Sequence, residues 1–178
     1  MGDKAGEGSA YNNLGFAYGT LGDFNRAIEY LSKGLNLVRE LGNKAGEGVI
    51  YNNLSSAYQK LGDFNRAIEY LRQHLSIPKE SEDRTEEECA FCLLGEAYHD
   101  LGDFNLAIKN ASKCLSIARK PLVRSNALKV VGKSYMSMGK LFQAMQFFQD
   151  YLKIAKRIGD RKNELEAYVL IGTVNGRR

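Results

Sequence analysis

The sequence predicts an all-helical solenoid built from repeated helix pairs. Residues 21–31 return letter for letter at 61–71, and a degraded copy follows at 101–111. A fixed period of 20 to 50 residues is typical of a solenoid, in which each unit buries its apolar face only against its neighbours. Function in such a chain is expected on a surface rather than in a catalytic pocket.

Apolar residues within each period recur at the spacing of amphipathic helices. In the first period, one face carries Tyr11, Leu14, Tyr18 and Leu21, and the next carries Phe24, Ala27, Ile28, Leu31, Leu35 and Val38. Each period therefore predicts two helices that pack face to face.

Short polar turns separate the predicted helices. Within a pair the turn is Gly22-Asp23, and it returns as Gly62-Asp63 and Gly102-Asp103. Glycine can adopt the left-handed conformation that ends a helix, and aspartate can accept hydrogen bonds from the free amides that begin the next one. Corresponding turns between pairs are expected at Gly2-Asp3, Gly42-Asn43, Glu82-Asp83 and Gly159-Asp160.

These turns divide the chain into a single array of four repeat units, each one helix pair, and a final helix. The expected units are residues 3–42, 43–82, 83–120 and 121–158, with a capping helix at about 161–174. The fourth unit is offset by 37 residues instead of 40, which predicts a tight connection at Pro121, a residue suited to the first turn of a helix. Pro78 predicts an early end to the preceding helix, followed by a mobile acidic loop.

Composition narrows the class of protein. A chain of 178 residues with 44% hydrophobic content can bury a sizeable core. It contains no run of eighteen apolar residues, and its N-terminus lacks the apolar stretch of a signal peptide. Three cysteines do not make a disulfide framework. We therefore expect a cytoplasmic protein that does not span a membrane, and the incomplete last unit suggests a piece of a longer one.

Charge is distributed unevenly along the chain. The net charge is +4, but residues 121–178 carry +7 and residues 81–120 carry −3. The basic end favours acidic partners. Its charges are dispersed over helix faces instead of clustered with aromatic residues, so nucleic-acid binding is not expected.

The pattern of large and small residues resembles the tetratricopeptide repeat. The matching residues are Tyr11, Leu14, Gly15, Tyr18, Gly22, Ala27 and Leu31; then Tyr51, Leu54, Tyr58, Gly62, Ala67 and Leu71; then Phe91, Leu94, Gly95, Tyr98, Gly102 and Ala107; then Leu128, Val131, Gly132, Tyr135, Gly139, Ala144 and Phe148. Glycines 15, 95 and 132 are expected where paired helices approach most closely. The forty-residue length and the Leu-Gly-Asp-Phe-Asn-Arg-Ala-Ile-Glu-Tyr segments resemble the subgroup found in Pins/LGN spindle-orientation adaptors.

This resemblance implies a right-handed superhelix whose first helices line a concave groove. The protein would then be a scaffold or adaptor that binds an extended peptide or a partner helix in that groove. The residues expected to line it are Asn12, Asn13, Phe16, Asn52, Asn53, Ser56, Gln59, Cys92, Glu96, His99, Lys129, Lys133 and Met136, with Gly19, Cys89, Asn126, Glu166, Val169 and Thr173 at corresponding places.

Two parts of the expected groove suggest particular contacts. Asn13 and Asn53 match the place where peptide-binding family members hold a ligand backbone, and a carboxamide both donates and accepts hydrogen bonds. The alternative is that these asparagines only cover a solvated face. Lys129 and Lys133 favour ligand carboxylates. The carboxylate clamp of chaperone-binding members is not reproduced, because Phe16 and Cys89 stand where that clamp needs asparagine and lysine.

Neither catalysis nor metal binding is expected. Cys89, Cys92, Glu96 and His99 fall on one helical stripe, but that stripe spans about 15 Å, beyond the reach of one ion. At most the two cysteines could share an adventitious metal. No nucleophile lies beside either histidine in sequence, and no glycine-rich loop could cradle a phosphate. We therefore predict no enzyme activity, no cofactor and no metal.

A second function class remains open. The array could be a structural spacer or a self-association module that acts through its ends. Tyr11, Leu14 and Leu35 lie in the first unit, and they are expected to be partly uncovered there. Exposed solenoid ends tend to stack on one another.

Overall fold

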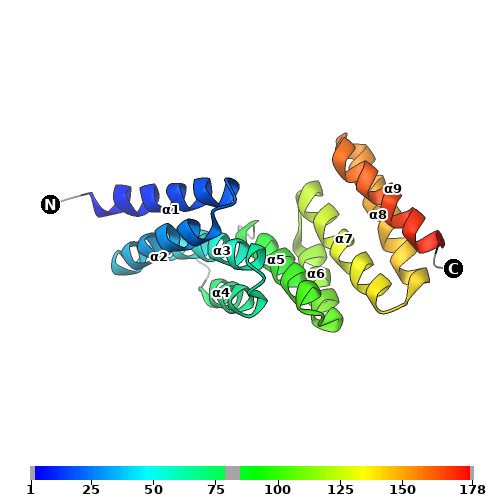
Figure 1. Ribbon diagram of the computed structural model, residues 1–178, viewed down its shortest axis with the longest axis horizontal. Coiled ribbons are helices and arrows are strands. Elements are labelled where there is room, and N and C mark those ends of the chain that lie inside the picture. The colour runs from blue at the N-terminus through cyan, green and yellow to red at the C-terminus, as the bar shows by residue number, and fades with distance from the viewer. Residues whose placement is uncertain (1–2, 79–84, 177–178) are drawn as a thin grey trace. The chain divides into compact units, whose positions relative to one another are not determined.

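The regular elements of the computed structural model are all α-helices over residues 3–78 and 85–176, which are the residues it describes (Figure 1). The chain forms two compact units, residues 1–82 (unit 1) and 83–178 (unit 2). Unit 1 contains α1 (Lys4–Thr20), α2 (Phe24–Glu40), α3 (Lys44–Lys60) and α4 (Phe64–Ser76). Unit 2 contains α5 (Thr85–Leu101), α6 (Phe104–Ile117), α7 (Pro121–Ser137), α8 (Leu141–Ile158) and α9 (Arg161–Gly176). The predicted all-helical fold class is confirmed, whereas the single array stays a prediction.

The predicted turn chemistry is present at each junction within a helix pair of unit 1. Gly22 has a φ of 83°, and the Asp23 carboxylate accepts the backbone N–H of Arg26 at 3.1 Å. Gly62 and Asp63 repeat the same geometry before α4. Each aspartate satisfies an amide that the first turn of the helix leaves without a backbone partner.

Both prolines mark the boundaries that the sequence predicts. Pro121 is the first residue of α7, only four positions after α6 ends at Ile117, so the connection is tight. Helix α4 has 13 residues and ends at Ser76, whereas α2 has 17. The acidic loop expected after Pro78 falls largely on residues 79–84, which lie outside the described residues.

Glycines allow the helices of each pair to pack closely. A Cβ atom added to Gly15 would lie 2.5 Å from Cγ of Leu31, and one added to Gly132 would lie 2.5 Å from the Phe148 ring. At Gly95 the nearest atoms, on Ala111, would be 3.1 Å away. The close approach predicted at these three positions is therefore confirmed.

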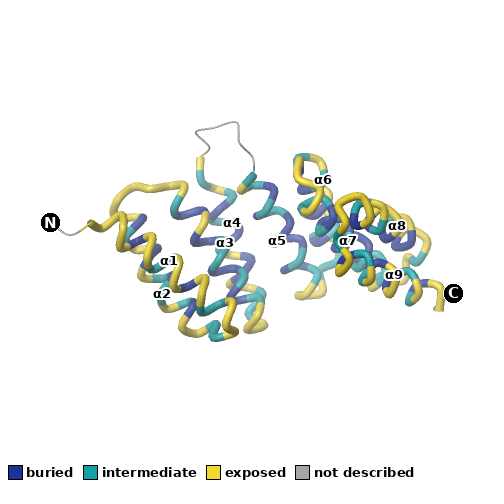
Figure 2. The backbone as a smooth tube through the Cα atoms, turned by 90° about the horizontal axis from the view of Figure 1, so that it is seen from above, coloured by how far each residue is buried: buried dark blue, intermediate teal, exposed yellow. Residues whose placement is uncertain are grey.

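Burial differs between the first helix and the later helices of unit 1. In α1 the buried residues are only Gly8 and Gly15, whereas α3 buries a full stripe that includes Ile50 and Leu54. Figure 2 shows α1 mostly in the colour of exposed residues. Leu35 is nevertheless buried, at 5% exposure, so the expectation that it is uncovered is wrong, because α2 turns it into the core.

Among the residues that the structure describes, two neighbouring clusters contribute to the core of unit 2. Phe148, Tyr151 and Val174 are fully buried where α7, α8 and α9 meet. Cys92, Cys114 and Val130 lie in the other cluster, which joins α5, α6 and α7. Within the described parts of both units, no helix combines the length and apolar character needed to cross a membrane.

Candidate functional site

The first helices of unit 1 lie beside each other and share a polar surface, which we name the α1–α3 seam. It comprises Asn12, Asn13 and Phe16 of α1 together with Asn53 and Ser56 of α3. Nδ2 of Asn53 donates a hydrogen bond to Oδ1 of Asn12 at 2.9 Å. The bond joins two of the predicted groove residues directly, although they are 41 positions apart in sequence.

The two bonded carboxamides keep most of their hydrogen-bonding capacity. A carboxamide has two N–H donors and a carbonyl oxygen that accepts two bonds. The Asn12–Asn53 contact uses one donor and one acceptor. Asn13, on the same turn of α1, is exposed. The seam can therefore present both donors and acceptors to a further polar group.

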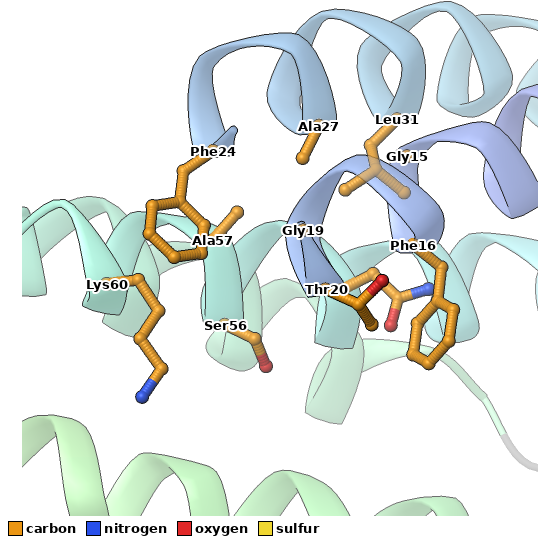
Figure 3. Close-up of a pocket in the computed structure, with 11 residues that line it drawn as sticks. Gly15, Phe16, Gly19, Thr20, Phe24, Ala27, Leu31, Ser56, Ala57 and Lys60 are labelled. Atoms are coloured by element: carbon orange, nitrogen blue, oxygen red, sulfur yellow. The ribbon is translucent and has the colours of Figure 1, made fainter. Parts of the chain in front are cut away.

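Hollows lie on both sides of the Asn12–Asn53 bond. The first, which we name the Gly19 hollow, is drawn in Figure 3 and is lined by Gly15, Phe16, Gly19, Thr20, Phe24, Ala27, Leu31, Asn53, Ser56, Ala57 and Lys60. The second is lined by Ala5, Gly8, Ser9, Asn12, Asn13, Val38, Leu41, Asn43, Gly46, Val49 and Ile50. The hydrogen bond between Asn12 and Asn53, which we name the polar bridge, therefore lies between two hollows of the seam.

The Gly19 hollow exists because small residues meet where other helix pairs place larger ones. A Cβ atom on Gly19 would touch only Ala27, at 3.9 Å. Counting from the aromatic or leucine residue that begins each repeat pattern, the positions equivalent to Gly19 are Gln59, His99 and Met136. Sequence reasoning placed Gly19 in the groove but missed the cavity. The signal in the sequence was that the first copy has a glycine at this position, whereas the other three copies have a larger residue.

Two predicted residues of α3 face different surroundings. Oδ1 of Asn52 lies 2.8 Å from Nδ1 of the buried His74 on α4, so its carboxamide is held inside unit 1. Gln59 is half-buried and does not line the Gly19 hollow. Asn53 and Ser56 are therefore the residues that α3 contributes to that hollow from the predicted set.

Cys92 does not face a groove, and its prediction as a groove residue is corrected. It is only 6% exposed and belongs to the same buried cluster as Val130 of α7. The physical reason is the residue on the neighbouring helix: α1 and α3 place asparagines between them, whereas α5 and α7 bring a cysteine and a valine together. Cysteine without a disulfide behaves as a small apolar side chain. Glu96 on the same helix is half-buried.

The predicted basic surface of unit 2 is partly compensated within the unit. Nζ of Lys129 lies 3.2 Å from Oε2 of Glu166, and Nζ of Lys133 lies 3.5 Å from Oε1 of the same carboxylate. The Tyr151 hydroxyl also donates to Glu166. Burial alone would raise the pKa of Glu166, but the Lys129 charge and hydrogen bond, aided by Lys133 and Tyr151, lower that pKa below its ordinary value.

His99 lies beside a serine that sequence spacing did not bring near it. Nδ1 of His99 is 3.1 Å from Oγ of Ser134, but this hydroxyl donates its proton to the Val130 carbonyl at 2.8 Å. Ser134 is fully buried, and burial lowers the pKa of His99. Because the Ser134 hydroxyl donates its proton to the Val130 carbonyl, His99 does not activate this serine as a nucleophile. The pair therefore holds α5 against α7.

Other predicted residues of unit 2 also pack internally. Met136 is partly buried against the cluster around Phe148. The His99 ring lies 5.5 Å from the ring of Phe104. Among the residues that the structure describes, no three His, Cys, Asp or Glu side chains gather in a way that could hold a metal ion.

Family models match two segments of the chain. Both are described as tetratricopeptide repeat, one over residues 6–80 and the other over residues 90–121, and together they cover more than half of the sequence. The chain carries tetratricopeptide repeats. The coarse family resemblance seen in the sequence is confirmed. The tetratricopeptide repeat is a scaffold for protein–protein interaction, and its members are in general non-catalytic.

Solved structures of other repeat proteins share the fold. A signal-transduction ATPase with a tetratricopeptide repeat sensor from Pyrococcus horikoshii matches with a TM-score of 0.81 and 21% identity, over 96% of this chain and 26% of that one. BtubC from P. vanneervenii matches with a TM-score of 0.80 and 20% identity, over 90% of this chain and 67% of that one. Cut9, in the complex Cut9–Hcn1, matches with a TM-score of 0.76 and 21% identity, over 95% of this chain and 30% of that one.

These likenesses establish the fold and no more, because all are below 25% identity. The chain spans less than a third of the ATPase and of Cut9. The comparison with curated proteins gave no match.

Proposed function

We propose that the chain is an adaptor module that binds an extended peptide along the α1–α3 seam. The observation that carries the proposal is the Asn12–Asn53 hydrogen bond, which holds two carboxamides at the surface with donors and acceptors to spare. An extended peptide offers alternating N–H and C=O groups, which carboxamides can bind without regard to side-chain identity. The exposed Asn13 extends the same polar strip.

Selection from a displayed library of random twelve-residue peptides tests this proposal. Peptides that bind the wild type should bind Asn53→Ala at least tenfold more weakly, since this change removes the donor to Asn12 and the acceptor beside it. Asn36→Ala is the matched control, because Asn36 is an exposed asparagine on α2, away from the seam. Selected peptides that bind wild type, Asn53→Ala and Asn36→Ala equally would refute binding at the seam.

We also propose that a ligand carboxylate binds near Lys129 and Lys133. Both lysines already contact Glu166, so an acidic ligand has to displace that side chain. The double change Lys129→Glu and Lys133→Glu should abolish preference for acidic peptides. Unchanged preference would show that the basic end of the chain does not select the ligand.

Self-association is the second candidate function, and exposed apolar residues on α9 favour it. Leu165, Tyr168 and Val169 are 66%, 48% and 60% exposed, and on α1 Leu14 and Phe16 are exposed as well. Sedimentation velocity over a hundredfold range of protein concentration tests this role. Val169→Lys should weaken any association, whereas a monomer at all concentrations would exclude it.

Three finer predictions from the sequence belong to the same proposal. The forty-residue spacing is retained in the helix starts Lys4 and Lys44 and in Phe24, Phe64 and Phe104, which supports the Pins/LGN-like subgroup. The three cysteines are free, which supports a reducing, cytoplasmic location. His99 and Ser134 are committed to structural hydrogen bonds, which supports a module without catalysis of its own. Fractionation of cells that express the chain tests the location.

A further inference from the structure

The Gly19 hollow has the size and lining of a receptor for one apolar side chain. Its volume is about 190 Å³, and an apolar cavity of about 150 Å³ is large enough to hold benzene. Phe24, Ala27, Leu31 and Ala57 contribute apolar side chains to the lining, and the glycines at positions 15 and 19 add no side chains. The polar side chains of the lining are Thr20, Asn53, Ser56 and Lys60.

In two of the other three helix pairs, the residue at this position packs inside the protein. The residues equivalent to Gly19 are Gln59, His99 and Met136. Met136 packs against the core of unit 2, and His99 packs against Phe104. The repeat pattern therefore leaves space for a side chain at Gly19 that the chain itself does not supply.

The neighbours of the hollow indicate how an occupant would arrive. Asn53 belongs both to the lining of the hollow and to the polar bridge of the seam. Phe16 stands at the rim, 61% exposed, on the same helix as Gly19 (Figure 3). A peptide backbone bonded to the carboxamides would thus hold one of its side chains next to the opening and beside the Phe16 ring.

We propose that the Gly19 hollow is an anchor pocket that takes one leucine-, methionine- or phenylalanine-sized side chain of an extended peptide bound on the seam. This proposal rests on the proposed function, since it names what the seam selects in its ligand. Selectivity arises from size and apolar character: alanine leaves most of the hollow empty, and a charged side chain would lose its hydration among the aromatic and aliphatic residues of the lining.

A small probe tests the pocket without any peptide. N-acetyl-leucine methylamide is titrated into the labelled protein and followed by amide chemical shifts in NMR spectra. Saturable shifts are expected at Gly19, Thr20, Ser56 and Ala57, and N-acetyl-alanine methylamide should produce much weaker ones. Gly19→Gln places the residue of the equivalent position 59 in the hollow and should abolish the shifts. Equal shifts from the leucine and alanine probes, or none at these residues, would overturn the pocket.

The same variant separates the pocket from the wider proposal. Peptides selected on the wild type should share one large apolar residue at a fixed position and should bind Gly19→Gln at least tenfold more weakly. Gly172→Gln is the matched control: Gly172 also lies in a helix, and a Cβ atom there would meet nothing within 4 Å. If peptides lose affinity for Asn53→Ala but keep it for Gly19→Gln, the seam binds peptide and the anchor pocket is refuted. If the leucine probe binds but no selected peptide depends on Asn53, the hollow accepts an apolar side chain, but the adaptor proposal and the role of the hollow as a peptide anchor on the seam are both refuted.

Discussion

Equivalent positions on the first helices of the helix pairs lie at the surface in unit 1 and pack internally in unit 2. In unit 1, Asn12 and Asn53 bond to each other at the surface, and Gly19 leaves a hollow beside them. In unit 2, Cys92 is buried with Val130, and Met136 packs into the core. A repeat scaffold therefore does not by itself make a binding surface. The binding surface that we propose lies where the variable residues are small or keep hydrogen-bonding groups available to a ligand.

The two units also differ in the charge of the residues that were expected to contact a ligand. The seam of unit 1 presents neutral amides, whereas Lys129 and Lys133 of unit 2 have an internal carboxylate partner in Glu166. The positive charge counted in the sequence is thus partly compensated at the place where a ligand was expected. An acidic ligand in unit 2 competes with a side chain of the protein, and a ligand of unit 1 does not.

The largest expected effect tests whether the two units share one packing rule. Gly15→Ala and Gly132→Ala should each destabilise the protein by about 1–2 kcal/mol, because the added Cβ meets Leu31 or Phe148 and overpacking outweighs the gain in helix propensity. Gly172→Ala should stabilise it by up to about 1 kcal/mol, since the space there is open. Urea unfolding measures all three. Opposite signs for Gly15→Ala and Gly132→Ala would show that the helix pairs pack differently.

The next effect concerns the helix caps. Asp63 in unit 1 and Lys140 in unit 2 have almost the same backbone angles, −87° and 71° against −85° and 67°, but the lysine makes no capping bond. Lys140→Asp should therefore stabilise unit 2 by about 0.5–1 kcal/mol, and Asp63→Ala should destabilise unit 1 by about 1 kcal/mol. Thermal melting checks both changes. A Lys140→Asp protein no more stable than wild type would mean that the cap geometry of α8 is not available to aspartate.

A smaller effect follows from the lowered pKa of Glu166. Its ionised form is favoured in the folded state, so the stabilisation is present above the ordinary pKa of about 4.3 and is lost as pH falls through the lower folded pKa. Glu166→Gln should lower stability at pH 7 by less than about 1 kcal/mol and should flatten the loss between pH 5 and pH 3. Unfolding free energies at these pH values provide the measurement. Parallel pH profiles for the variant and the wild type would contradict the role of Glu166.

The smallest effect concerns His99, whose pKa is lowered chiefly by burial. The neutral form is favoured on folding, so this stabilisation is present above pH of about 6.5 and is lost as pH falls below it. His99→Gln, which copies the residue at position 59, should lose less stability than the wild type between pH 7.5 and pH 5. The difference should be a few tenths of a kcal/mol at this half-buried site. Melting temperatures at both pH values test it, and identical shifts in the two proteins would exclude the titration of His99.

The sequence by itself determined the helices, their turns and their close contacts. The periodicity predicted the helical faces, Gly22 and Asp23 predicted a turn, and glycines 15, 95 and 132 predicted where paired helices come closest. These features are local or repeat at a fixed spacing, and for this reason one chain contains enough information to find them. The expectation that the asparagines of α1 and α3 line a groove came from the resemblance to the tetratricopeptide repeat, and it stays a proposal.

The tertiary structure alone decided which variable residues remain at the surface. Cys92 and Val130 are 38 positions apart and become buried together, whereas Asn12 and Asn53, 41 positions apart, bond in the open seam. Lys129 acquires Glu166 as a partner from α9, and Ser134 reaches His99 from α7. Each outcome depends on what the neighbouring helix places opposite, and helical periodicity carries no information about that pairing. The hollow at Gly19 is the clearest case, since an absent side chain becomes a cavity only when no neighbour fills it.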